Sequence, residues 1–452
     1  MNLRRPLDSR DLTVLFARLA NLGAGPVVAV AVGVFFTAKV QGYYFSFASL
    51  LGAQTLFESG IGFVLIQLAA HEAAFLKIGM DGTLVGNEVS KSRLADIFHF
   101  GVRWYSTLAG VMIFGIGIGG WITFEGHHDA VDWRLPWVLL TLAGGFDFLI
   151  QPLLAVLEGC GKIVQVYRYR GLSVLVRSSI LTACAWYGFN LYSSAPAMVS
   201  GSLVGVLYLS RDSKLFWTLW RAPRASRLNW RRDVLPFQWR IAVSWIAGFF
   251  TTTLFTPIVL AQSGAVAAGQ MGMTIAMFNG ISMISFSIMQ SRVPEMGGLA
   301  AARSWKSLDR LFSRRAVVSA ALFLLGAGAL VVMVWLAKSF GLDVANRVLD
   351  MPSMEVLGLG YFAAYVLALE ATYLRCQKQE PFFILSLVTG SLVLMTSFIL
   401  GHRFGPFGIC VGYSTVYMMI ALPLGTVILR RNRRRNRRAD LEAGGVLEEV
   451  RS

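Results

Sequence analysis

Charged residues are scarce in this sequence of 452 residues, of which only 15% are Asp, Glu, Lys or Arg. Soluble domains carry about 25% of such residues, so the composition argues against an ordinary soluble protein. Acidic residues are fewer than basic residues, with 25 Asp and Glu against 41 Lys and Arg. Cysteine is also rare, with four residues, and the sequence has no C-x-x-C pair or Cys/His ligand spacing. We therefore predict neither a disulfide framework nor a metal site.

The sequence has long apolar runs, and 55% of its residues are hydrophobic. A charge-free run of about 20 apolar residues can cross a bilayer as a helix. Clear runs are residues 19–38 and 104–124, and residues 241–291 are long enough for two spans broken near residues 262–270. The pattern predicts an all-α polytopic membrane protein with about twelve spans, the remaining ones being 41–70, 135–157, 163–188, 190–210, 316–337, 356–374, 382–401 and 404–429.

Basic residues fall mostly on one side of these predicted spans. Of the 41 Lys and Arg, 35 lie before the first span or in the segments that follow the even-numbered spans, the last span included. This count includes basic residues at the helix ends that adjoin these segments. The positive-inside rule then predicts that both termini are cytoplasmic. No cleavable signal peptide is predicted, and the first helix is expected to act as its own insertion signal.

We interpret the net charge of +16 mainly as the result of basic residues that set the orientation in the membrane, with a second role in binding anionic lipid. The run of arginines at 430–438 could also indicate nucleic-acid binding. It directly follows a predicted span and precedes acidic residues, so we favour a lipid-facing run and expect no nucleic-acid partner.

Two halves of six spans each are suggested by residues that recur 216 positions apart. The recurring residues are one proline, one cysteine and one lysine in each half: Pro136 and Pro352, Cys160 and Cys376, Lys162 and Lys378. Both cysteines fall in predicted cytoplasmic turns, where thiols stay reduced. We therefore interpret them as marks of an internal repeat, a common feature of transporter folds.

The predicted boundaries are an N-terminal lobe at 1–210, a linker at 211–236, a C-terminal lobe at 237–430 and a basic tail at 431–452. The linker interleaves three tryptophans with arginines, as interfacial helices do. We expect it to lie on the inner leaflet between the lobes; the alternative is a disordered linker.

Ionisable residues inside spans are costly and are functional candidates by default. Those singled out here are Glu58, Asp147, Arg177 and Glu370. The first three lie at mid-membrane depth in the first half. They could form one ion-pair network that ties helices together, or Arg177 could bind a pyrophosphate through its planar fork.

Uncharged residues complete the candidate site. Asn21 and Asn279 could line the cavity or hydrogen-bond between helices. Gly25, Pro26 and Pro152 are candidate hinges, because glycine and proline can bend membrane helices.

Two segments carry a family resemblance. Residues 42–74, which begin GYYFSF, resemble the second helix of bacterial polysaccharide exporters, and residues 153–171 resemble the turn between their fourth and fifth helices. These exporters, O-antigen flippases among them, belong to the multidrug/oligosaccharidyl-lipid/polysaccharide flippase superfamily. The resemblance implies two six-helix lobes in a V around a central cavity. It also implies that an undecaprenyl-pyrophosphate-linked oligosaccharide is flipped across the bacterial inner membrane for polysaccharide biosynthesis.

Three other functions remain as alternatives. A cation-coupled multidrug and toxin extruder commonly has a carboxylate in the first helix, and residues 19–38 hold none. A lipid II flippase usually has extra helices. A polysaccharide polymerase usually has a large external loop, which this sequence lacks. We therefore expect a monomeric transporter that is not an enzyme and needs no cofactor, with other polysaccharide-assembly membrane proteins as possible partners.

Overall fold

The structure is a computed structural model that describes residues 9–54, 58, 61–79, 84–126, 131–222, 253–377 and 382–449. Nearly all of them are helical, which confirms the predicted all-α polytopic class. The chain divides into two compact units, residues 1–249 with 264–269 and residues 250–263 with 270–452. The two units are described separately below.

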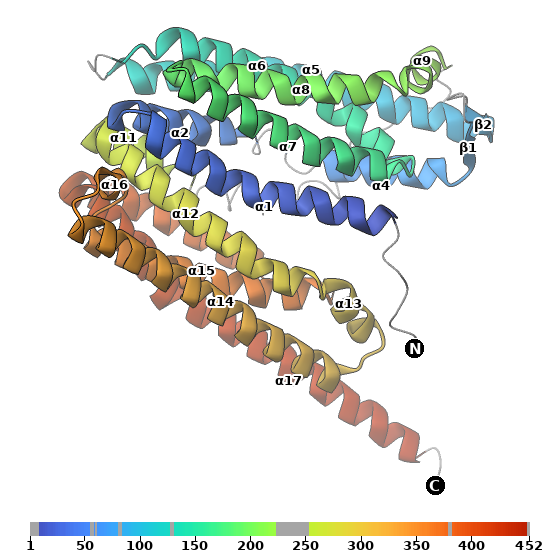
Figure 1. The fold of residues 1–452 in the computed structure, drawn as a ribbon. Helices are drawn as coiled ribbons and strands as arrows, with labels where there is room; N and C mark the ends of the chain where they lie inside the picture. The colour runs from blue at the N-terminus through green and yellow to red at the C-terminus, as the bar shows by residue number, and fades with distance from the viewer. Residues whose placement is uncertain are drawn as a thin grey trace. The chain divides into compact units, whose positions relative to one another are not determined.

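Unit 1 is a bundle of long helices (Figure 1). Helix α1 packs on α7, α7 packs on α8, and α6 packs on α4, α5 and α8. The predicted second span is divided between α2 and α4, and residues 55–57 and 59–60 lie outside the described residues. The bundle helices are α1 (Ser9–Phe35), α2 (Ala38–Gly52), α4 (Ile61–Ala73), α5 (Glu88–Glu125), α6 (Arg134–Gly159), α7 (Ile163–Trp186) and α8 (Ser194–Ser210), with a 3-10 turn η1 (Asn190–Ser193) before α8.

One end of unit 1 carries two small elements, a hairpin that the sequence did not predict and a short helix within the predicted linker. A two-stranded antiparallel hairpin pairs β1 (Leu76–Ile78) with β2 (Leu84–Gly86). Beside it lies α9 (Ser213–Arg221), which begins the predicted linker. Its Leu215 and Leu219 are fully buried, whereas Trp217 and Trp220 are more than half exposed. The helix is thus amphipathic, as expected for the described part of the linker; residues 223–236 lie outside the described residues.

Unit 2 is a second helical bundle, in which α15 packs against α14, α16 and α17. Its helices are α11 (Phe255–Ser263), α12 (Ala265–Gln290), α13 (Val293–Ala301), α14 (Trp305–Ser339), α15 (Met351–Arg375), α16 (Phe383–Thr415) and α17 (Leu422–Glu449), with a 3-10 turn η3 (Asp343–Arg347) and a π-helical segment η4 (Val416–Ala421).

Two helix breaks in the second half of the chain fall at glycines. The break predicted near residues 262–270 is confirmed at Gly264, where φ is +86°. A second break interrupts α16 at Gly405, which has φ 60° and ψ −146° and precedes Pro406. Both backbone conformations favour glycine, because a Cβ atom would clash with the backbone there and glycine has none.

The predicted basic tail continues α17 as a helix, and part of it docks on unit 2. The Arg433 guanidinium lies 3.2 Å from Asp309 Oδ1 and covers the rings of Phe312 and Tyr373 at 5.1 Å and 4.8 Å. Tyr373 also donates a hydrogen bond to Asp309 at 2.8 Å. One side of the basic segment is therefore fixed to α14 and α15, while Arg430, Arg431, Arg434 and Arg435 are exposed.

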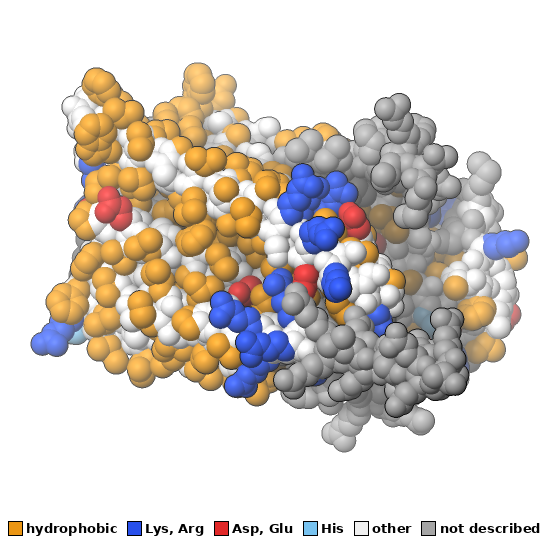
Figure 2. Space-filling model, turned by 90° about the horizontal axis from the view of Figure 1, so that it is seen from below, with side chains coloured by type: hydrophobic (Ala, Val, Ile, Leu, Met, Phe, Trp, Pro, Cys, Tyr) orange, Lys and Arg blue, Asp and Glu red, His pale blue; other side chains and the backbone are white. Residues whose placement is uncertain are grey.

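Apolar side chains cover much of the outer surface, as a membrane protein requires. Figure 2 shows a broad band of hydrophobic side chains on one face, with a cluster of Lys and Arg beside it. Among the described residues, seven helical segments are long and apolar enough to cross a membrane. The chain is thus a multi-pass membrane protein.

Candidate site in the first helical unit

Arg177 forms an ion pair with Asp147 inside unit 1. Arg177 Nη2 donates to Asp147 Oδ1, which joins α7 to α6. The same oxygen accepts a 2.7 Å hydrogen bond from Ser202 Oγ of α8. A lone buried carboxylate would be strongly disfavoured in an apolar span, and these two donors stabilise its charge. The arrangement ties three helices together.

Gly201 makes room for the arginine. A Cβ atom at position 201 would lie 2.5 Å from Arg177 Cγ and 2.7 Å from Cδ, so any side chain there would displace the guanidinium. Arg177 is the more accessible partner, because its side chain is 28% exposed and that of Asp147 is 10% exposed. An anion that approaches the pair therefore meets the guanidinium first.

A cavity of about 230 Å³ adjoins Arg177. Side chains from α1, α2, α6, α7 and α8 line it, and most of them are apolar. Ser178, the residue after Arg177, also lines this cavity. The guanidinium at this cavity can donate hydrogen bonds to a phosphate or carboxylate group, although its pairing with Asp147 offsets part of its charge.

Glu58 does not join this pair. It is held instead by Tyr105 of α5, whose hydroxyl donates to Glu58 Oε1 at 3.3 Å. Of the two carboxylates considered as partners for Arg177, the structure brings only Asp147 to it.

Glu370 lies in unit 2 and has its own donor. Thr426 Oγ1 of α17 donates to Glu370 Oε1 at 2.8 Å. The side chain is buried, with the residue 6% exposed, rather than extended to the surface. Within the described part of the chain, its second oxygen Oε2 has no hydrogen-bond partner.

The two asparagines play different parts. Asn21 is exposed and donates to Ala17 O of its own helix at 2.8 Å. Asn279 accepts a 3.4 Å hydrogen bond from Tyr361 OH, which links α12 to α15. The interhelical interpretation therefore fits Asn279, and Asn21 remains accessible.

The candidate hinges lie inside continuous helices. Gly25 and Pro26 fall within α1, and Pro152 falls within α6. Each proline removes one backbone hydrogen bond to the carbonyl four residues earlier, which weakens the helix locally. The interruption at Gly405 lies beside the boundary predicted between the spans 382–401 and 404–429, and its Gly-Pro dipeptide is a strong helix-breaking signal.

Cys160 and Cys376 occupy the same place in their units, at the C-caps of α6 and α15. Their repeat partners Pro136 and Pro352 lie in the first turns of these helices, whereas Lys378 lies outside the described residues. All four cysteines are free. Burial raises the pKa of the Cys160 thiol from 9.0 to about 11, and burial also raises the pKa of Cys376. Both side chains are therefore thiols at neutral pH.

Comparisons with known proteins identify the fold but no close relative. No family model matches the sequence, and no curated protein matches it. Among solved structures, an inward-facing multidrug resistance MATE family transporter of the MOP superfamily has 13% identity and a TM-score of 0.55, with 95% of this chain and 96% of that chain covered. The lipid II flippase MurJ, in an inward closed conformation, has 10% identity and a TM-score of 0.60 over 93% of this chain and 87% of its own.

A third similar structure is a mutant of the Vibrio cholerae MATE transporter VcmN, with 13% identity, a TM-score of 0.55 and coverage of 94% and 95%. The alignments run along nearly the whole chain in all three cases. Their names describe two of these proteins as transporters and one as a flippase. The chain therefore has the fold of MOP-superfamily membrane transporters.

Proposed function

We propose that this chain flips an undecaprenyl-pyrophosphate-linked oligosaccharide from the inner to the outer leaflet of a bacterial inner membrane by alternating access. The observation that carries the proposal is Arg177, an accessible guanidinium at a cavity inside a membrane-spanning bundle. A guanidinium binds phosphate oxygens through two parallel hydrogen bonds, a geometry that lysine lacks.

Asp147 and Ser202 prepare Arg177 for this role. Because Asp147 binds Nη2, the guanidinium is held in one orientation before the substrate arrives. Less side-chain entropy is then lost on binding. The nearby carboxylate also limits the affinity for an anion, which helps a transporter to release its cargo on the second side.

The exposed Trp217 and Trp220 support a position for α9 at the inner-leaflet headgroups. Tryptophan favours that interface, and Arg221, which lies 4.2 Å from the Trp217 ring centroid, adds attraction to anionic lipid. A position of α9 at the inner leaflet agrees with the distribution of basic residues, from which we infer that both termini are cytoplasmic.

The alternative is a cation-coupled multidrug extruder, which most of the similar structures support by their names. Against it stands the absence of Asp and Glu from residues 19–38. In its favour stand the carboxylates Glu58 and Asp147 in unit 1, which could bind a coupling cation or a cationic drug.

Reconstitution into liposomes separates these functions. A fluorescent lipid-linked oligosaccharide is placed in one leaflet, and its arrival in the other leaflet is followed with an impermeant quencher. We expect flipping by the wild-type protein and almost none by Arg177→Ala. A matched assay measures uptake of a cationic rhodamine dye driven by a proton or sodium gradient. Dye transport without oligosaccharide flipping would replace the proposed function with the alternative.

A further inference from the structure

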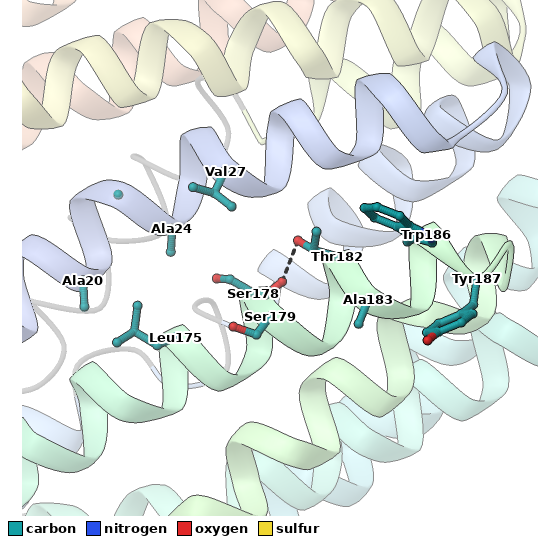
Figure 3. A pocket seen from close by; sticks show the side chains of 11 residues that line it. Ala20, Ala24, Val27, Leu175, Ser178, Ser179, Thr182, Ala183, Trp186 and Tyr187 are labelled. Atoms are coloured by element: carbon teal, nitrogen blue, oxygen red, sulfur yellow. Dashed lines mark hydrogen bonds between the residues drawn. The ribbon is translucent and has the colours of Figure 1, made fainter.

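A second and larger cavity in unit 1 is a groove between α1 and α7, with a volume of about 580 Å³. Figure 3 shows Ala20, Ala24 and Val27 of α1 facing Leu175 and Thr182 of α7 across the space between the two helices. Pockets that hold small organic ligands measure about 300–1,000 Å³. The groove is therefore large enough for a ligand.

Two hydroxyl groups of the groove, those of Ser178 and Thr182, already donate to their own helix. Ser178 Oγ donates to Val174 O at 2.8 Å, and Thr182 Oγ1 donates to Ser178 O at 2.8 Å (Figure 3). These two hydroxyls therefore have no proton left to donate to a sugar. Most of the other lining residues are apolar, so the groove suits a hydrocarbon chain.

The groove adjoins the cavity of Arg177 at one shared residue. Ser178 lines both the groove and the cavity that contains Arg177. From Leu175 to Tyr187, the C-cap residue of α7, the groove extends over twelve residue steps, or about 18 Å at 1.5 Å per step. One amphiphile can therefore place its anionic group at Arg177 and several isoprene units along α7.

We propose that the groove between α1 and α7 holds the isoprenoid chain of the substrate while its pyrophosphate binds Arg177. This assignment rests on the proposed function. Lipid tails are as apolar as the groove, so hydrophobic transfer alone would not select this chain. Selection arises because the headgroup at Arg177 keeps the attached chain at a high local concentration beside the groove.

Gly23 offers a way to fill the groove without disturbing the fold. It lines the groove, and a Cβ atom placed there meets no atom of the described structure within 4 Å. Leucine is also a better helix former than glycine, so Gly23→Leu is expected to fold. Gly119→Leu is the matched control, since its Cβ likewise meets nothing within 4 Å in the described structure and it lies on α5, outside the groove.

The test compares flipping of two substrates with the same glycan and pyrophosphate, one with an undecaprenyl chain and one with a farnesyl chain. Filling an apolar binding site changes the ratio of the rates for two substrates by about tenfold. We expect Gly23→Leu to slow the undecaprenyl substrate by about that factor relative to the farnesyl one. Gly119→Leu should match the wild type for both, and Arg177→Ala should lose both.

Each other outcome has a definite meaning. If Gly23→Leu leaves the preference between the two chains unchanged while the wild type flips both, the groove does not hold the chain and the proposed function stands. If excess phosphatidylglycerol abolishes the chain preference, the groove is an ordinary phospholipid site and our assignment is wrong. If the wild type flips neither substrate, the proposed function fails and the groove assignment fails with it.

Discussion

Gly201 of α8 lies directly against the side chain of Arg177 of α7, so that even a methyl group at position 201 would contact the aliphatic part of the arginine. The smallest residue of one helix thus sets the position of the charged group of the next. Small residues at such crossings let membrane helices approach closely.

Gly201→Ala should therefore impair transport without removing any charged group. The added methyl group displaces the Arg177 side chain and weakens its bond to Asp147. We expect flipping to fall by about tenfold, as overpacking costs of 1–3 kcal/mol imply. The measurement is the flipping rate per inserted protein. Gly110→Ala is the control, since a Cβ there meets nothing within 4 Å in the described structure, and equal rates for both variants would contradict the role of Gly201.

Substitutions of Arg177 and Asp147 separate binding from structure. Arg177→Ala leaves the Asp147 carboxylate with Ser202 as its donor and should destabilise the protein by about 3 kcal/mol. Arg177→Lys keeps the charge without the planar fork and should retain part of the transport. Adding Asp147→Asn to Arg177→Ala should restore folding, because it removes the unpaired charge.

The readouts are thermal stability in detergent and flipping by inserted protein. If Arg177 binds the substrate, the folded double variant remains inactive. If the double variant regains flipping together with stability, Arg177 has only a structural role.

The cysteines should be dispensable and slow to react. Because burial raises the pKa of Cys160 to about 11, thiolate-selective reagents should label it slowly at pH 8 in the folded protein and quickly after unfolding. This thiol should lower the free energy of unfolding only above its ordinary pKa of 9.0, since the unfolded chain then loses the proton first. Cys160→Ser combined with Cys376→Ser should keep normal flipping, and loss of flipping at normal protein levels would instead indicate a redox or metal role.

Arg433 should hold the C-terminal extension of α17 to unit 2. Arg433→Ala removes its pairing with Asp309 and its contact with the Tyr373 ring, interactions that together contribute about 1 kcal/mol. Hydrogen exchange of backbone amides at residues 430–436 should then be roughly fivefold faster. Arg434→Ala is the matched control, because Arg434 is an exposed neighbour. Equal protection in both variants would show that Arg433 does not hold the helix.

Reporter fusions test the predicted orientation. Because 35 of the 41 basic residues lie on one predicted side, a C-terminal green fluorescent protein should fluoresce, whereas a C-terminal alkaline phosphatase should be inactive. Phosphatase activity from the full-length fusion would place the C-terminus outside and reverse the topology.

Hydropathy predicted the class and most helices because long apolar runs carry a strong signal. It missed the first part of α5, residues 88–103, where charged residues interrupt the pattern although Leu94 and Phe98 are buried in the core. It also missed the hairpin of β1 and β2, since strands of three residues are too short to show a period.

The site was predicted in part. Charges inside apolar spans pointed to Arg177 and Asp147 because such charges need partners. The sequence could not tell whether Arg177 would pair with Asp147 or with Glu58, since that depends on how helices rotate against one another. Ser202 and Gly201 carried no separate signal, because serine and glycine are ordinary in membrane helices.

Two long helices contain the third predicted span of their halves of the chain: α5 has 38 residues and α14 has 35. At 1.5 Å per residue, α5 is about 57 Å long, whereas the hydrocarbon core of a bilayer is about 30 Å thick. Each of these helices is therefore long enough to cross the hydrocarbon core and to extend beyond it. A tilt of about 10° would move one tip of α5 by about 10 Å relative to the other, from simple geometry on that length. A tilt of α5 about its membrane-crossing part would therefore move the end where the hairpin and α9 lie.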